Sequence, residues 1–445
     1  MQQTVFAIRR VAARPPTAVG HRRQLLALLL CLGLPWTGHA LAPATADTTT
    51  PESLQADASL SEMVRYAYHH HPRLQASQAL VGAAASRGQR EAALPDPMLE
   101  LNQGLRESGN QSLAVTQSIP LWGKRGLTRQ RADHEVDAAR ATLHANQLAV
   151  ERELRRAWID YAWSQAAEAL IGEQLSLLTQ LTEETRRRYE AGRSDLPALL
   201  RLQNEQARLA NEQQALRSQQ QAAHSRLASA LAIDSAALGH PATTLPAPPI
   251  PPDDTAPLLT SLTEHNPQLH ALRHQIDARA RGQQLADRAG RPDLKLGLEY
   301  MRQDMMPRDE LALMVGIQLP LQRGRYRAQR TEADALHRAS HWQLQEQQQR
   351  LAADLEIALF NLQQAARTAR LYQDSLLPRA EQALAVTVTA WQAGQASFAD
   401  LIASQRELLG LALGHQRALA DAFSYQTDID VLTGRSLLTH HGETP

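Results

Sequence analysis

Four short motifs occur twice in this chain, in the same order and offset by 195 to 202 positions. HPRLQASQALV (71–81) resembles NPQLHALRHQI (266–276), and LPDPMLEL (94–101) resembles RPDLKLGL (291–298). QSIPLWGKRG (117–126) resembles IQLPLQRGRY (317–326), and YEAGRSDLPALL (189–200) resembles WQAGQASFADLI (391–402). Ordered matches at a nearly constant offset predict a tandem duplication, so the chain is expected to fold into two similar halves.

A proline-rich stretch, GHPATTLPAPPIPPDDTAP, separates the two halves at residues 239–257. Such a composition favours an extended and fairly stiff linker. We therefore expect a first repeat over residues 43–238, a linker over 239–257, a second repeat over 258–435 and a tail over 436–445.

Residues 1–42 have the pattern of a secretory signal peptide: a start rich in arginine, the apolar run LLALLLCLGLPW (25–36) and a small-residue ALA cleavage site (40–42). The apolar run is too short to span a membrane as a helix. Arg22-Arg23 leaves twin-arginine export as an alternative, and Leu30 before Cys31 argues against a lipoprotein. Because Cys31 is the one cysteine, the mature chain is expected to lack disulfides and thiolate metal sites.

The composition favours long helices rather than a conventional globular core, since aromatic residues make up 4% of the chain. Lys+Arg and Asp+Glu both number 46, so no basic surface for nucleic acid is expected. The segment from Lys124 to Glu190 contains no proline, and after it a seven-residue spacing of apolar residues predicts a coiled-coil seam. Its members are Leu202, Leu209, Leu216, Ala223 and Ala230, with Ile402, Leu409 and Phe423 in the second half. The proline-free segment and the repeated spacing together predict two long antiparallel helical hairpins.

Four short segments alternate between apolar and polar residues, which predicts β-strands at about 97–105, 111–120, 293–301 and 311–320. The predicted apolar, lipid-facing positions are Leu99, Leu101, Val115, Ile119, Leu296, Leu298, Val315 and Ile317. The predicted polar positions, which would line a lumen, are Glu100, Asn102, Thr116, Lys295, Glu299 and Gln318. Each strand has about the 9–11 residues that cross a bilayer when tilted. The alternative is two hairpins that lie on a soluble core and bury the same apolar face.

Four strands cannot close a barrel, and open edges in hydrocarbon leave backbone groups unpaired at several kcal/mol each. Copies of the chain must therefore combine their strands. Two copies give eight strands, whose interior is mostly filled by side chains, and three copies give twelve, which is wide enough for a channel. We expect a homotrimer in which acidic lumen residues such as Glu100 and Glu299 favour cations.

The signal peptide, the duplicated halves, QSIPLWGKRG and RRRYEAGRSDLPALLRLQNEQARL together resemble the TolC family of outer-membrane efflux channels. The resemblance covers about residues 56–435 and implies a mainly helical chain with a small β part. It also implies a trimeric twelve-stranded barrel in the outer membrane of a Gram-negative cell, surrounded by outer-membrane lipid and continued by a helical barrel through the periplasm. The implied partners are a periplasmic adaptor and an inner-membrane transporter, of the RND type first, and PLWGKRGLTRQRA resembles the heavy-metal-cation branch.

The hairpin turns are the predicted adaptor-contact site. Its residues are Gly192, Asp195, Leu196, Gly394, Phe398 and Asp400. Glycine permits the positive φ that a helix end often adopts, and Asp195 and Ser397 are expected to cap the returning helices. Leu196 and Phe398 are expected to be exposed, as at an interface.

No enzyme motif, cofactor site or metal site is predicted. HHH (69–71) before Pro72 has a metal-binding composition, but the end of a solvated helix explains it, and a loop holding Met301, Met305 and Met306 is a further thioether-rich segment. Two rival interpretations remain: a periplasmic adaptor and a soluble periplasmic coiled-coil scaffold. An adaptor would need small β-rich domains that flank one hairpin, whereas this chain has two predicted hairpins and strands of bilayer-spanning length. Fractionation separates the interpretations, because the channel would sediment with the outer membrane and need detergent.

Overall fold

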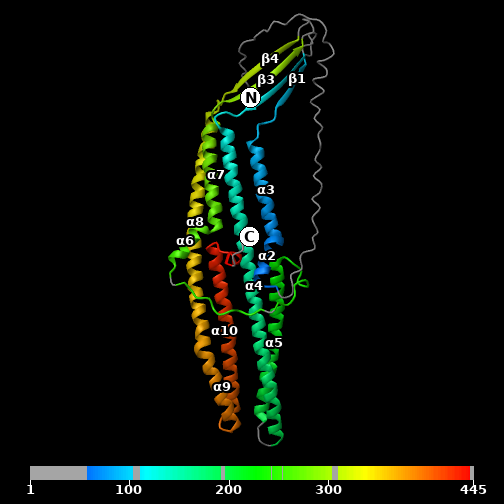
Figure 1. Ribbon diagram of the computed structural model, residues 1–445, viewed down its shortest axis with the longest axis vertical. Helices are drawn as coiled ribbons and strands as arrows, with labels where there is room; N and C mark the ends of the chain where they lie inside the picture. Colours follow the sequence, from blue (N-terminus) through cyan, green and yellow to red (C-terminus); the bar gives the residue numbers. More distant parts are fainter. Residues whose placement is uncertain are drawn as a thin grey trace. The chain divides into compact units, whose positions relative to one another are not determined.

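The computed structural model describes residues 58–103, 111–191, 196–241, 243–252, 254–302 and 309–440. The expected signal peptide, Gly192, Asp195, Met305 and Met306 lie outside these ranges. The chain divides into two compact units (Figure 1). A sheet unit comprises Arg90–Arg129 and Gln284–Thr331, and a helical unit comprises Leu54–Gln89, Gln130–Gln283 and Glu332–Pro445 as far as these are described.

The sheet unit contains one four-stranded antiparallel sheet in the order β1-β2-β3-β4. Its strands are β1 (Met98–Gln103), β2 (Gln111–Ile119), β3 (Asp293–Arg302) and β4 (Glu310–Gln318). The two halves of the chain meet in this sheet, because β2 pairs with β3 and Val115 lies opposite Leu298. Within the described residues, β1 and β4 each pair on one side, so the sheet has two open edges.

The PLWGKRG motif forms the turn between β2 and α4 (Lys124–Glu190). Trp122 and Gly123 both have positive φ, of 62° and 67°, which a glycine adopts without strain. The indole Nε1 of Trp122 donates to the Pro292 carbonyl at 2.7 Å, and Lys124 Nζ forms a partly buried ion pair with Asp293 at 2.9 Å. The motif thus joins the end of β2 to the start of β3, which explains its unusual composition.

In the first half, α2 (Leu60–His70) and α3 (Pro72–Ala92) precede the sheet, and α4 is followed by the returning helix α5 (Leu196–Leu231). The stretch predicted to be helical from Lys124 to Glu190 is one helix of 67 residues. Gln206 donates to Thr179 and Arg217 to Glu168, so α4 and α5 lie side by side as an antiparallel hairpin (Figure 1). Leu202 and Leu209 of the predicted seam are buried.

The second half contains α6 (Ala256–His265), α7 (Pro267–Ala289), α8 (Arg323–Leu371), α9 (Leu377–Gln392) and α10 (Phe398–Leu432). Unlike α4, the long helical segment before Gly394 is interrupted, since a π-helical turn, η1 (Tyr372–Leu376), separates α8 from α9. Pro378, near the start of α9, lacks the N–H that an α-helix needs, and a π turn is one way to accommodate this.

Two apolar clusters stabilise the helical unit, one for each half of the chain. The first packs α2, α4 and α5 around Met63, Leu154 and Leu227, and the second packs α6, α8 and α10 around Leu262, Leu359 and Ile429. A buried polar network connects the halves: Arg155 on α4 bonds Asp430 on α10 at 2.9 Å. The described residues of 239–255 form neither helix nor strand, and α11 (Leu437–His440) follows α10.

Candidate functional site

The register of the sheet places most of its large apolar side chains on one face, and Glu100, Lys295 and Glu299 on the other. Neighbouring positions on the first face include Leu99 opposite Val115, Val115 opposite Leu298, and Leu296 opposite Val315. All eight residues predicted to be lipid-facing are on this face, which follows from strict pairing because successive strand residues alternate sides. Their contact with lipid stays a prediction.

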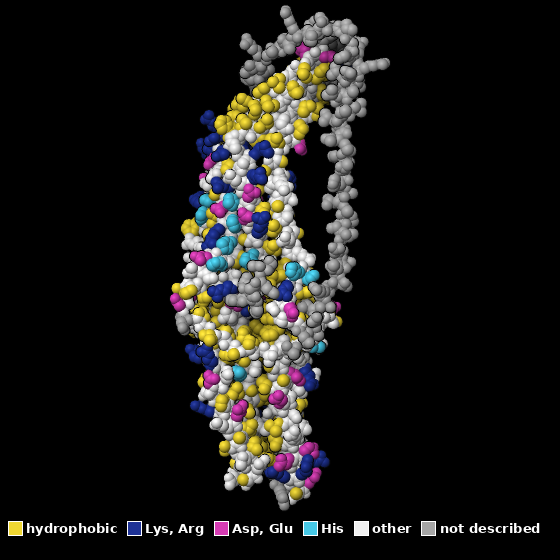
Figure 2. Space-filling model, viewed as in Figure 1, with side chains coloured by type: hydrophobic (Ala, Val, Ile, Leu, Met, Phe, Trp, Pro, Cys, Tyr) yellow, Lys and Arg dark blue, Asp and Glu magenta, His cyan; other side chains and the backbone are white. Residues whose placement is uncertain are grey.

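The apolar face is exposed rather than buried. Leu101 on β1 is 74% exposed and Leu313 on β4 is 72% exposed. Figure 2 shows hydrophobic side chains gathered over the strands. Two hairpins on a soluble core would cover this face, so the exposure argues against that alternative within the described chain. Large contiguous apolar surfaces mark interaction with a membrane or a partner.

The opposite face combines charged residues with small ones. Glu100 and Glu299 both lie opposite Ala114, and Lys295 lies opposite Gly316. A Cβ added to Gly297 would lie 2.8 Å from Thr116 Cγ2, so neighbouring strands crowd this face. Such crowding is expected on the inner side of a curved sheet, where glycine permits close approach. The six residues predicted to line a lumen all have this orientation, and their role stays a prediction.

The turn of the second hairpin is a Schellman motif followed by a capping box. Gly394 has a φ of 74°, and Gln395 N–H donates to the Ala390 carbonyl at 2.8 Å. Ser397 caps α10: its hydroxyl accepts from Asp400 N–H, while the Asp400 carboxylate accepts from the Ser397 hydroxyl and N–H. These hydrogen bonds hold the pKa of Asp400 below its usual range. Asp400 thus has a capping role that the sequence left open.

The two apolar residues predicted to be exposed at the hairpin turns, Leu196 and Phe398, differ in their exposure. Leu196 is 46% exposed at the first residue of α5, in agreement with expectation. The expectation of an exposed Phe398 is wrong: its side chain is half-buried, and its ring lies 6.2 Å from that of Trp391 in a T-shaped contact. Phe398 packs against a cluster that includes Ile402 and Leu409, which gives it a core to enter.

The ends of the two hairpins are also bound to each other, which the sequence analysis missed. Leu178 and Leu202 of the first hairpin share an apolar cluster with Ile402 and Leu409 of the second. Arg188 on α4 lies over the ring of Trp391 on α9, with its guanidinium carbon 4.5 Å from the ring centroid.

An ion pair completes this junction. Glu205 on α5, 3% exposed, bonds Arg208 on its own helix and Arg406 on α10. Its hydrogen bond with Arg406 is the first cause that lowers the pKa of Glu205 to about 2. A sequence signal existed: Glu205 lies between Leu202 and Leu209, three residues after the first, at a position that a coiled coil normally fills with an apolar residue.

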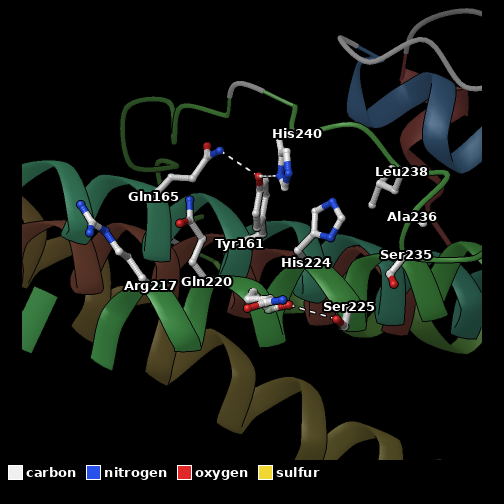
Figure 3. A pocket seen from close by; sticks show the side chains of 11 residues that line it. Tyr161, Gln165, Arg217, Gln220, His224, Ser225, Ser235, Ala236, Leu238 and His240 are labelled. Carbon is white, nitrogen blue, oxygen red and sulfur yellow. Dashed lines mark hydrogen bonds between the residues drawn. The ribbon is translucent and has the colours of Figure 1, made fainter. Parts of the chain in front are cut away.

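A cavity of about 650 Å³ lies in the helical unit between α4, α5 and the start of the linker (Figure 3). Some of its polar groups bind one another or the segment that follows α5. The Gln165 side chain donates to Tyr161 and Pro241 and accepts from Thr243, and His224 Nε2 lies 3.0 Å from the Gly239 carbonyl. These hydrogen bonds hold the start of the linker against the first hairpin. Burial of the Tyr161 side chain raises its pKa.

The histidine-rich segment at residues 69–71 is a helix end, as expected. His69 and His70 are exposed in the last turn of α2, and His71 is its C-cap before Pro72 begins α3. Met301, the described methionine of the proposed loop, is a β3 residue on the polar face opposite Ser112.

Comparison with known proteins places this architecture. Residues 258–430 match the family model described as outer membrane efflux protein. The chain is 24% identical over 346 residues to the cobalt-zinc-cadmium resistance protein CzcC of Cupriavidus metallidurans, a match that covers 77% of this chain and 82% of CzcC.

Solved structures show the same fold at low identity. The outer membrane protein VceC of Vibrio cholerae is 19% identical, with 85% of this chain and 96% of VceC covered and a TM-score of 0.71. The open state of the MtrE outer membrane channel of Neisseria gonorrhoeae is 16% identical, with 85% and 89% covered and a TM-score of 0.71.

The fold, with its small antiparallel sheet and long helical hairpins, is therefore that of the TolC-like outer-membrane channels. Over residues 258–430 the chain is similar to the outer membrane efflux protein family, and over 346 residues it is similar to CzcC, a cobalt-zinc-cadmium resistance protein. None of the helices in the described ranges combines the length and apolar character needed to cross a bilayer.

Proposed function

We propose that this chain is the outer-membrane channel subunit of a tripartite efflux system that exports heavy-metal cations or other small molecules. The observation that carries the proposal is the sheet, with an exposed apolar face, a charged opposite face and two open edges. A membrane solvates the exposed apolar face, and a water-filled lumen solvates the charged face. Pairing with further copies of the chain satisfies the backbone groups of the two open edges.

Three copies supply twelve strands, which close a barrel wide enough to conduct, so the subunit acts as a homotrimer. The duplicated order of elements gives each copy two hairpins and the trimer six. The helical unit then extends into the periplasm, where the hairpin ends, including exposed Leu196, meet a periplasmic adaptor of an RND-type inner-membrane transporter.

Conduction is passive in this proposal, and opening comes from a change in how the hairpins pack. The contacts between hairpins, Glu205 with Arg406 and Arg188 with Trp391, are the bonds that such a change breaks. A partner that binds the separated arrangement more tightly shifts the equilibrium towards it. Heavy-metal cations are the first substrates to test, because CzcC is a cobalt-zinc-cadmium resistance protein.

Deletion of the gene from its own cell, followed by complementation, tests this function. We expect deletion to lower tolerance to Zn²⁺, Co²⁺ or Cd²⁺, and the wild-type chain to restore it. The protein should sediment with the outer membrane and have the mass of three chains by light scattering in detergent. A monomer that stays soluble without detergent would contradict the proposal and favour a periplasmic scaffold. If the protein is an outer-membrane trimer but deletion of its gene changes tolerance to organic toxicants alone, the channel function would stand and metal export would be excluded.

A further inference from the structure

Three metal-ligating side chains from two helices lie close together in the helical unit. His134 and Asp137 are on α4, and His274 is on α7. One ligand atom from each residue lies within 4.8 Å of the other two, and among the described residues this is the one such group of three. We propose that these three residues, named here the α4–α7 site, bind a divalent transition-metal ion such as Zn²⁺ or Co²⁺.

The two helices present the ligands in a way that suits one ion. His134 and Asp137 are three positions apart, so their side chains project from neighbouring points on the same face of α4. The ring of His274 crosses from α7 to stack near that of His134, with centroids 6.4 Å apart and an interplanar angle of 29°. Buried Ala138 and Ala278 flank the site on the two helices, and such small residues permit close helix packing.

An unpaired atom provides a second, independent observation. The Nδ1 atom of His274 is buried and has no hydrogen-bond partner within the described structure. Buried polar atoms nearly always have a partner, and an ion or a water supplies it where the protein does not. A metal ion bound to an imidazole nitrogen is one such partner, and the other ring nitrogen is then left to contact protein or solvent.

The ligand types select the class of ion. Two imidazole nitrogens and one carboxylate oxygen suit Zn²⁺, Co²⁺ or Ni²⁺, whereas Mg²⁺ and Ca²⁺ prefer all-oxygen sites and Cu(I) prefers sulfur. Bonds of about 2.0–2.2 Å require the ligand atoms to approach each other more closely than 4.8 Å, which side-chain rotation can supply. Three protein ligands leave a fourth position for water, so the bound ion can exchange.

Arg140 sets the expected strength of binding. Its Nη1 lies 3.0 Å from Asp137 Oδ1, and its side chain is 67% exposed. The guanidinium competes with a metal ion for the carboxylate and repels its charge, so we expect weak binding that improves when this charge is removed. A purely structural histidine pair would show no such improvement.

The proposal concerns binding by the protein itself and does not depend on transport. The experiment uses the mature chain purified in detergent without a polyhistidine tag and stripped by chelator. Co²⁺ is titrated and followed by its visible absorption, with Zn²⁺ competition and calorimetry for stoichiometry. We expect one ion per chain, weaker binding by about tenfold or more in His274→Ala and Asp137→Asn, and tighter binding in Arg140→Gln.

His337→Ala is the matched control. His337 lies on α8 with its ring 4.8 Å from that of His341, and this pair has no third ligand among the described residues. Its removal should leave the Co²⁺ affinity unchanged. Asp137→Asn preserves side-chain size, so it tests the site even if His274→Ala melts at a lower temperature. Absence of Co²⁺ binding, equal loss in His337→Ala, or full affinity in both site variants would overturn the proposal.

Discussion

The first and second halves of the chain carry corresponding elements in the same order, yet their long helices differ on the way to the hairpin turn. In the first half α4 continues unbroken for 67 residues. In the second half the corresponding length is divided into α8, the π turn η1 and α9. Pro378 supplies the local reason for the interruption, because its missing N–H and its ring are incompatible with a continuous α-helix.

Each half has a contact in which a glycine on one helix faces a large side chain on the other, but the glycine is on opposite members of the two helix pairs. In the first, a Cβ added to Gly172 on α4 would lie 3.3 Å from the Gln213 side chain of α5. In the second, the large residue is on the outgoing segment and the glycine on the returning helix: Tyr372 of η1 reaches to 2.9 Å of a Cβ added to Gly414 on α10. A helix pair needs a certain total volume at each contact, and either partner can supply it.

The polar residues in the two seams differ as well. Glu205 follows Leu202 by three residues, and Gln405 follows Ile402 by three. Both are 3% exposed, but Glu205 is ionised and bound by Arg406, whereas Oε1 of Gln405 has no hydrogen-bond partner within the described structure. The contact between hairpins is thus asymmetric, with the negative charge on the first half and the positive charge on the second.

The largest effect of a substitution is expected in the sheet, where β2 of the first half pairs with β3 of the second and both halves should respond in the same way. Val115→Arg in β2 and Leu298→Arg in β3 place a cation at opposite partners on the apolar face. If this face contacts lipid, each costs roughly 2–4 kcal/mol at the bilayer midplane. Both variants should lose outer-membrane insertion, measured by membrane fractionation and trimer mass. Gln318→Leu, on the polar face, is the control and should insert. Normal insertion of both arginine variants would refute lipid contact.

The hairpin ends should respond differently in the two halves. Phe398→Asp places a charge in a half-buried apolar contact with Trp391, so we expect about 2–4 kcal/mol lower unfolding free energy. Leu196→Asp changes an exposed residue and should leave stability within about 0.5 kcal/mol; if this residue contacts the proposed adaptor, the substitution should lower metal tolerance. Chemical denaturation and tolerance assays on the same variants separate these effects. Equal destabilisation by both substitutions would remove the distinction between the ends.

The Glu205 ion pair should make stability depend on pH. Its pKa falls from 4.5 to about 2 on folding, so this contribution is present above the unfolded pKa and is lost as the pH falls towards 2. Because both arginines are half exposed, we expect about 1–3 kcal/mol rather than the full value of the shift.

The measurement is thermal melting followed by circular dichroism between pH 6 and about pH 2. The melting temperature of Glu205→Gln should fall less over this range than that of the wild type. The equivalent variant of the second half, Gln405→Leu, should retain the wild-type slope, because its neutral side chain binds no proton. Identical slopes for Glu205→Gln and the wild type would contradict the role of the ion pair.

The smallest effect concerns the contact between the glycine and the large side chain in the second half. Gly414→Ala forces the Tyr372 ring to move and should lower stability by about 1–2 kcal/mol, despite the better helix propensity of alanine. Gly410→Ala, on the same helix with open space around it, should raise stability by up to about 1 kcal/mol. Denaturant midpoints measure both effects, and adding Tyr372→Leu should restore the stability lost in Gly414→Ala. Stabilisation by Gly414→Ala in the wild-type background would show that the contact is loose.

Local pattern in the sequence was sufficient for the elements and their faces. Alternation along the strands determined which residues share a side, because the β period of two leaves one arrangement for a given pairing. The absence of proline and the seven-residue spacing determined α4 and the buried stripe of α5. Gly394, followed three residues later by Ser397, determined the second turn and the N-cap of α10, since these are backbone effects of nearby residues.

Tertiary structure alone decided which distant residues meet. The sequence places Phe398 next to a turn, but its burial depends on Trp391 and on the cluster shared with the other hairpin. Arg406 finds Glu205, and His274 finds His134, through packing of helices that no local period encodes. Their side chains project from surfaces whose relative rotation is set by the volumes of many residues at once, so the charge pair and the α4–α7 site exist only once the helices have packed.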